Sequence, residues 1–203
     1  MLTSLDTLLE ALAARIGRLS RRAVVGLFWS CAMALQPEYQ EWATVRNVRT
    51  DRILREALTA ARQFAAHGRE PAGCRRLLDA LEASAPAGES PDVVSATAAQ
   101  DCWICADIAI RILVHDDYIA GPAIEYALEP TLQRASEELF GVSQVGSGPS
   151  ENEQVEAILA HFPVSKAVDF LQWATDYLEC RPSPSEDELD LLAGRAVVLT
   201  PGL

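Results

Sequence analysis

The stretch VVSATAAQDCWICADIAIRIL, from Val93 to Leu113, decides the fold. It is apolar almost all round, and a helix without a wide polar face belongs in the middle of a bundle. Its Asp107 and Arg111 are four residues apart, so they can pair on one face of that helix. We therefore expect a central apolar helix from about Val93 to Leu113, with the rest of the chain packed around it.

The segments on either side carry apolar residues at three- and four-residue spacing, the pattern of amphipathic helices. Before the central stretch, the sequence predicts helices over residues 4–16, 20–35, 37–42, 51–67 and 70–85. After it, the sequence predicts helices over 121–140, bent at Pro130, over 152–180, split at Pro163, and a short acidic helix after Ser185. The expected fold class is all-α: a single domain, residues 1–203, built as a bundle of about seven to nine helices.

Two stretches are expected to lie outside the bundle. Residues 142–150 are rich in Gly and Ser, which predicts a flexible loop. The run RPSPS over residues 181–185 breaks the helix before it. We therefore expect residues 181–203 to form a loosely attached C-terminal segment that ends in a short extended stretch over 197–203.

The N-terminus has no secretory layout, because its cationic run at residues 15–22 follows the apolar stretch instead of preceding it. The longest apolar run, from Ala23 to Leu35, is too short to cross a membrane. The five cysteines are an odd number in a chain without an export signal, which favours free thiols. We expect a cytoplasmic protein that does not enter a membrane.

Charge is distributed unevenly along the chain. Residues 1–76 hold twelve arginines and seven acids, a net +5, and residues 77–203 have a net charge of −17. A surface of one sign steers oppositely charged partners toward it. Six acids fall in one 23-residue window and form the candidate partner-binding site: Asp116, Asp117, Glu125, Glu129, Glu137 and Glu138. A solvated helix face explains such acids in most proteins, and a docking surface for a basic protein is the sharper alternative.

The arginines of the first third allow two interpretations. They could pair with acids of the second half and so close the bundle, or they could form a nucleic-acid surface. We favour pairing and expect no nucleic-acid partner, because the arginines are mixed with apolar faces and the whole chain carries −12. The arginines in question are Arg15, Arg18, Arg22, Arg46, Arg49, Arg52 and Arg55.

No motif in the sequence predicts catalysis, a metal or a cofactor. Cys102 and Cys105 form a CxxC, but they lie inside the expected central helix, whereas a redox CxxC opens a helix and a zinc site needs more ligands. Core packing is the favoured interpretation of both thiols, with redox and metal roles as alternatives. His115-Asp116-Asp117 is favoured as a solvated helix end over a cation site. We expect no catalytic residue, no metal and no cofactor.

Two strings resemble a known family. FWSCAMALQPEYQEWA at residues 28–43 resembles the start of the YjaG-like family of bacterial all-helical proteins of unknown function. AAQDCWICADIAIRIL at residues 98–113 is similar to that family's central small-residue helix. The resemblance covers about residues 4–180. The chain departs from the family pattern at Met33 and Ala34, where a Glu-Arg pair is common, and also in the 142–150 loop and the tail.

The resemblance implies an α-helical bundle and no established enzymatic activity, and similar proteins include candidate immunity proteins. Together with the acidic second half, it leads to the hypothesis of an immunity-type inhibitor that neutralises a basic toxin domain through an acidic surface. The alternative is an enzyme or a small-molecule-binding protein with a pocket lined by the central helix. Homodimer formation is also left open.

Overall fold

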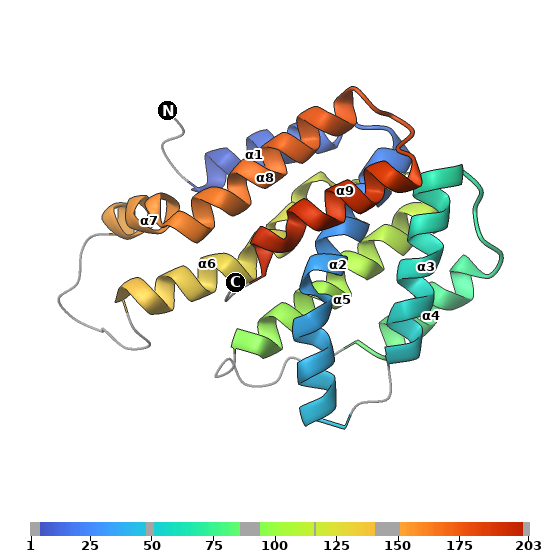
Figure 1. Ribbon diagram of the computed structural model, residues 1–203, viewed down its shortest axis with the longest axis horizontal. Helices are drawn as coiled ribbons and strands as arrows, with labels where there is room; N and C mark the ends of the chain where they lie inside the picture. Colours follow the sequence, from blue (N-terminus) through green and yellow to red (C-terminus); the bar gives the residue numbers. More distant parts are fainter. Residues whose placement is uncertain (1–4, 48–50, 86–93, 116, 141–150, 201–203) are drawn as a thin grey trace.

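A computed structural model describes residues 5–47, 51–85, 94–115, 117–140 and 151–200 (Figure 1). Within these residues the protein is a single all-α domain, and no strand is present. The expected fold class is therefore confirmed. The α-helices are α1 Leu5–Ile16, α2 Arg21–Val45, α3 Asp51–His67, α4 Cys74–Ala83, α5 Val94–Val114, α6 Glu125–Phe140, α7 Glu151–Ala160, α8 Phe162–Glu179 and α9 Glu186–Ala196. Two short 3-10 helices are η1 Gly121–Ile124 and η2 Val197–Leu199. The expected 142–150 loop lies outside the described residues.

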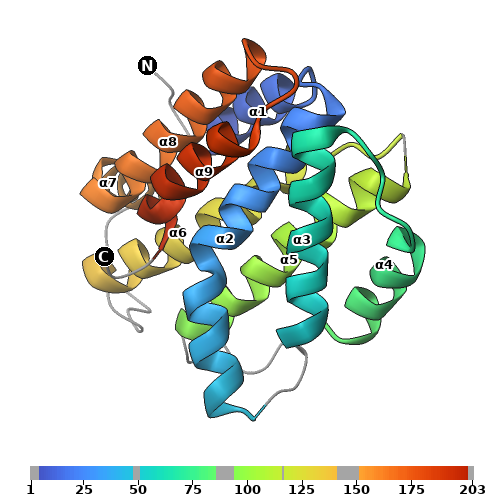
Figure 2. The same ribbon diagram turned by 45° about the vertical axis from the view of Figure 1, so that its right-hand side comes forward.

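The centre of the bundle is a pair of helices, α2 and α5. From Ala23 to Ala32 every residue of α2 is buried, and α5 is buried on nearly all sides from Ala98 onward. The thiol of Cys102 on α5 lies 3.3 Å from the carbonyl oxygen of Ala32 on α2, within hydrogen-bonding distance. The predicted central helix therefore shares the core with a second apolar helix. Figure 2 shows α3 beside α2, with α4 on the outer side of α3.

Pro37 does not end a helix, so the predicted break between residues 35 and 37 is wrong. One continuous helix, α2, runs through Pro37 to Val45. A proline inside a helix loses a backbone hydrogen bond and costs about 3 kcal/mol. Burial beyond the proline offsets this cost, because Tyr39 is fully buried with its ring centroid 5.7 Å from that of Trp103. Long-range packing thus overrides a local helix breaker.

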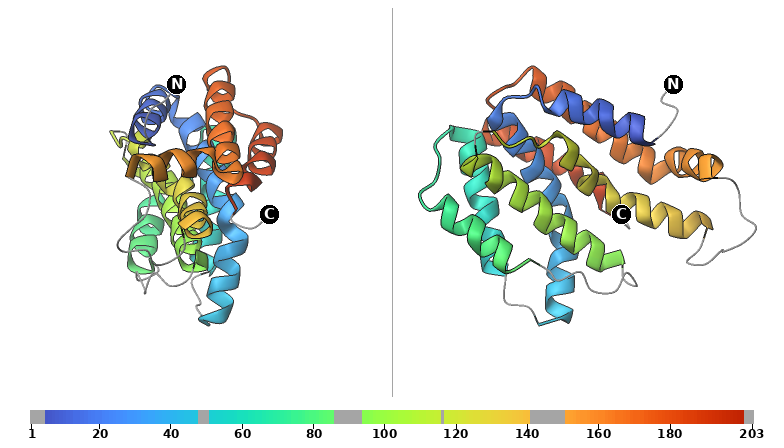
Figure 3. Two further views of the ribbon diagram at one scale, coloured as in Figure 1. Left: turned by 90° about the vertical axis from the view of Figure 1, so that its left-hand side faces the viewer. Right: turned by 180° about the vertical axis from the view of Figure 1, so that it is seen from behind.

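Some arginines of the first third join distant helices through acids, as expected. Arg15 of α1 pairs with Asp176 and, at 3.3 Å, with Glu179 on α8. Arg62 of α3 pairs at 2.8 Å with Asp190 on α9. Figure 3 shows α1 lying along α8, so the first helix packs against a helix from the last quarter of the sequence.

Arg22 differs from the expectation, because its hydrogen bonds go to backbone carbonyls, and the adjacent Arg21 also donates to backbone carbonyls. Arg21 donates to the carbonyl oxygens of Ile112 and Leu113, at 2.7 and 2.6 Å, in the last turn of α5. Arg22 donates to the carbonyl of Ala65 at 2.8 Å, in the last turn of α3. The last carbonyls of a helix lack intrahelical partners and carry partial negative charge. Two adjacent arginines at the start of α2 thus cap two other helices.

The C-terminal segment is packed into the bundle and is not loosely attached. Leu189, Leu192 and Ala196 of α9 are fully buried, and α9 lies against α2. Ser185 and Glu188 form the predicted capping box at its start. Residues 197–199 are helical where an extended stretch was expected, and the hydroxyl of Thr200 donates to the carbonyl of Ala34 at 2.9 Å. The buried apolar side chain of Leu199 holds η2 against the bundle.

Candidate functional site

The structure separates the six acidic residues of the predicted site. Asp116 lies outside the described residues, and Asp117 is exposed in the turn after α5. The other four are on α6, where Glu125 and Glu129 are one turn apart. At 3.6 residues per turn, Glu137 lies about 120° around the helix from Glu125. The residues of the window therefore do not share one face.

The acids at the end of α6 have partners within the protein. Glu138 accepts a hydrogen bond from Arg134 at 2.9 Å and lies 3.3 Å from Nε2 of His161. The Arg134 hydrogen bond holds the pKa of the Glu138 carboxyl below its ordinary value. Glu137 accepts a hydrogen bond from Gln133 at 3.1 Å. These two carboxylates are thus partly satisfied before any partner arrives.

Glu125 and Glu129 form no ion pair with a cation in the part of the chain that the structure describes, and both are exposed. Although the residue is exposed, neighbouring protein atoms keep water from part of the Glu129 carboxyl, and this desolvation, followed by the negative charge of Glu125, raises its pKa. Like charges at this spacing cost a few tenths of a kcal/mol on an isolated helix. The start of α6 is therefore the part of the predicted site whose negative charge is not neutralised.

Asp101 of α5 belongs to the same group of carboxyls, although sequence reasoning missed it. Asp101 is 2% exposed, and its Oδ2 atom has no hydrogen-bond partner among the residues that the structure describes. Burial, and then the negative charge of Glu129, raise the pKa of Asp101 to about 8. The signal in the sequence was a lone acid on the otherwise apolar first half of the central helix. Asp101 of α5 and Glu129 of α6 are thus close enough for their charges to interact.

The CxxC cysteines are core residues of α5. Cys102 and Cys105 are both fully buried, and burial raises the pKa of each thiol well above its ordinary value. A thiol held in its neutral form is a poor nucleophile and a poor metal ligand. Among the described residues, no three His, Cys, Asp or Glu side chains converge as a set of metal ligands. The favoured interpretation as core packing agrees with this environment.

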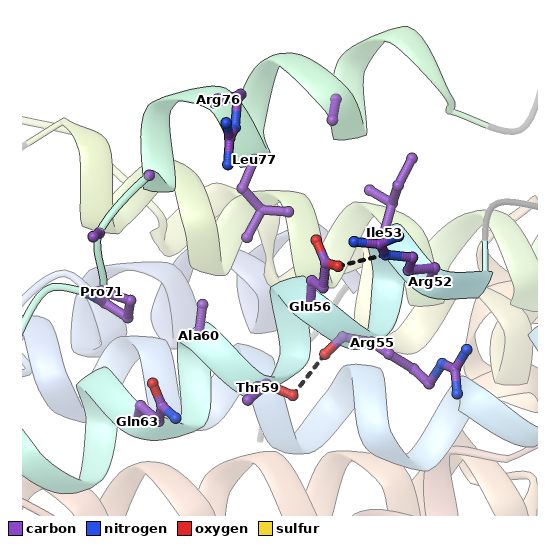
Figure 4. Close-up of a pocket in the computed structure, with 13 residues that line it drawn as sticks. Arg52, Ile53, Arg55, Glu56, Thr59, Ala60, Gln63, Pro71, Arg76 and Leu77 are labelled. Atoms are coloured by element: carbon purple, nitrogen blue, oxygen red, sulfur yellow. Dashed lines mark hydrogen bonds and ion pairs between the residues drawn. The ribbon is translucent and has the colours of Figure 1, made fainter.

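A groove of about 610 Å³ lies between α3 and α4 (Figure 4). Apolar side chains of both helices, including Ile53, Ala60 and Leu77, form its lining. Arg52 of α3 bonds to Glu56 one turn away at 2.7 Å, and Arg76 enters from α4. From Ala98 onward, where its side chains are described, the central helix contributes no residue to this groove. It therefore differs from the pocket that the enzyme alternative requires.

Sequence reasoning missed this groove because it assigned the arginines to pairing with the second half. Arg52 contradicts that assignment, since its partner Glu56 belongs to the first third. Arg49 lies outside the described residues. The groove could have been suspected from Arg52, Arg55 and Arg76, which recur on two consecutive amphipathic helices. Its existence depends on how α3 and α4 pack, which spacing alone does not determine.

Comparison with known proteins supports the fold. No protein-family model matches the chain, and no curated protein matches it either. A solved structure of a DUF416 family protein from Shewanella baltica is similar, with a TM-score of 0.68 and 13% sequence identity over 91% of this chain and 92% of that chain. A likeness at this identity shows a shared fold and no shared activity. The YjaG-like resemblance stays a prediction. No helix among the described residues combines the length and apolar character that crossing a bilayer requires.

Proposed function

We propose that this chain is a protein-binding protein, an immunity-type inhibitor that neutralises a toxin by docking the start of α6 on a basic surface of that toxin. The observation that carries the proposal is the exposed pair Glu125 and Glu129, which forms no ion pair with a cation among the described residues, while the charge of Glu129 acts on the buried carboxyl of Asp101. Local rules of stability are most often broken where a protein binds something. An arginine or lysine of the toxin would relieve the repulsion between the carboxylates of Glu125 and Glu129.

The docking is electrostatic in character. The net −17 of residues 77–203 steers a basic domain toward the protein, and the unpaired carboxylates provide the contacts. A cation placed between Glu125 and Glu129 favours the ionised form of both groups, so binding lowers the pKa of Glu129 from its raised value. Glu137 and Glu138 contribute less, because binding would first have to break their internal hydrogen bonds.

Reversing both charges by Glu125→Lys and Glu129→Lys is expected to slow association with the toxin about tenfold or more at low salt. Two lysines repel each other as two glutamates do, so the fold should lose little stability. The toxin to test is the product of the adjacent gene, expressed alone and together with this chain. Growth of the host and the association rate of the purified pair are the measurements.

The matched control reverses Asp6 and Glu10 on α1, an exposed acid pair with the same spacing. It changes the net charge equally and is expected to change the association rate less than threefold, since only the long-range field is altered. Failure of the chain to protect the host would contradict the immunity function. Protection that survives the α6 reversal would contradict only the docking face.

A further inference from the structure

We propose that the groove between α3 and α4 binds an acidic amphipathic helix of a partner protein. This site goes beyond the proposed toxin inhibition, since it has the opposite charge and lies on other helices. It is an open channel between two helices with a volume of about 610 Å³. Figure 4 shows Leu77 of α4 and Ile53 of α3 pointing into it, with Arg76 above and Arg52 at one end.

The lining of the groove suits an amphipathic helix. Ile53, Leu77 and Ala80 are only half-buried, and together with Ala60 they offer an apolar surface between the two helices. Helices of partner proteins dock in such grooves through apolar residues one turn apart. The groove continues past Thr59 and Gln63 into a second hollow lined by Arg62, Arg69 and His67. A helix of several turns therefore has a continuous track along α3.

The charge of the groove selects acids at the edges of that helix. The side chain of Arg52 is 82% exposed, and Arg76 is exposed and forms no ion pair in the described part of the chain. These two arginines differ from Arg15, Arg21 and Arg22, which are bonded to other helices. Carboxylates of a bound helix would find guanidinium donors at one end of the groove, from Arg52, and on its α4 side, from Arg76.

The first turn of α4 is positively charged, whereas a helix N-terminus favours negative charge. Its first turn holds Arg75 and Arg76 and no acid, and its N-cap Gly73 provides no side-chain cap. Cations near a helix N-terminus oppose the helix dipole. Carboxylates in the groove would reverse this opposition for Arg76, because they would lie beside its guanidinium. Arg76 thus occupies a position where stability alone would favour an acid.

Single-stranded nucleic acid suits the groove less well. Strands without base pairing are bound by aromatic stacking along a continuous basic track, and among the described residues none of those that line this groove is aromatic. Glu56 lies on α3 between Arg52 and Thr59 and places a negative charge among the arginines of the groove. The chain as a whole has a net charge of −12. A helix with apolar residues on one face and spaced acids beside them avoids both difficulties.

The test uses the full chain and a fluorescein-labelled 14-residue peptide, with leucines at positions one turn apart and glutamates between them. Fluorescence anisotropy at 0.1 M salt should show saturable binding. Arg76→Glu combined with Arg52→Glu should weaken that binding about tenfold or more. The matched control compares the single substitutions Arg75→Glu and Arg76→Glu. Both change the charge of the first turn of α4 equally, but of these two residues only Arg76 lines the groove.

Three outcomes would overturn the proposal: no saturable binding of the peptide, equal binding of polyglutamate or a DNA oligonucleotide of the same length, or equal loss from Arg75→Glu and Arg76→Glu. Polyglutamate has the charge without the apolar face, so its equal binding would show a nonspecific anion surface. The Glu125→Lys and Glu129→Lys chain should bind the peptide at least as tightly as the natural chain. Its behaviour separates failure of this groove from failure of the toxin-docking face.

Discussion

Gly121→Ala is expected to lower the free energy of unfolding by about 2 to 3 kcal/mol, because it adds a methyl group where two backbones meet. A Cβ on Gly121 would overlap the carbonyl oxygen of Ala13 in α1 and lie 3.0 Å from its carbonyl carbon. Backbone atoms in a helix cannot rotate away as a side-chain end can. The φ angle of Gly121 is not positive, so the cost comes from space and not from backbone conformation. The melting temperature should fall by roughly 4–12 °C.

Gly194→Ala is the matched control for this substitution. Gly194 lies inside α9, is exposed, and would place its Cβ with nothing within 4 Å. The same added methyl group is expected to stabilise the protein by about 0.5 to 1 kcal/mol, since alanine favours a helix more than glycine does. Thermal unfolding followed by circular dichroism measures both variants. A Gly121→Ala protein as stable as the natural one would show that α1 does not contact η1 as described.

Asp101→Asn is expected to raise the free energy of unfolding at pH 9 by about 3 to 5 kcal/mol, and to change it little near pH 4. Burial and the charge of Glu129 raise the pKa of Asp101 from its ordinary 3.8 to about 8. The folded protein therefore holds a proton on Asp101 between about pH 4 and pH 8 that the unfolded chain releases. Each unit of displacement corresponds to roughly 1.4 kcal/mol.

The sign of the effect follows from this proton. The protonated Asp101 makes its full contribution to the free energy of unfolding below about pH 4. This contribution falls as the pH rises toward 8, and above that value it does not change further. Asparagine has no proton to lose, so the variant should lack this part of the decline. Urea unfolding at pH 5, 7 and 9 measures the difference. Asp79→Asn, an exposed substitution on α4 with the same change in charge, should follow the natural chain at every pH. Equal curves for the Asp101 and Asp79 variants would mean that Asp101 is ionised in the folded state.

Periodicity was sufficient to locate most of the helices. The apolar spacing of Leu8, Leu12 and Ile16 depends only on local geometry, and α1 ends where Gly17 predicts. Pro37 shows the limit of such rules, because the burial of Tyr39 against a helix some 60 positions later decides whether α2 continues. Attachment of residues 186–199 likewise depends on a surface of α2 that no local pattern describes.

The candidate sites were less predictable than the helices. The acidic window was visible in the sequence, but the difference between Glu129 and Glu138 depends on where Arg134 and His161 lie in space. In the sequence Asp101 is one more polar residue, because its raised pKa depends on burial and on the charge of Glu129 on α6. The number of acids in the second half of the chain predicts a basic partner. The distances between helices decide which of these acids remain available to it.

The contacts that close the bundle also set the order in which a newly made chain can fold. Arg15 and Glu179 are 164 positions apart, and Thr200 and Ala34 are 166 apart. Ribosomes add about 5–20 residues per second, so α1 and α2 leave the ribosome roughly 10 to 30 seconds before the helices that cover them. α5 emerges earlier and can pack against α2, but for the rest of that interval the apolar surface of α2 has no α8 or α9 to pack against. Part of the core of the nascent protein therefore stays open to water until its last helix has emerged.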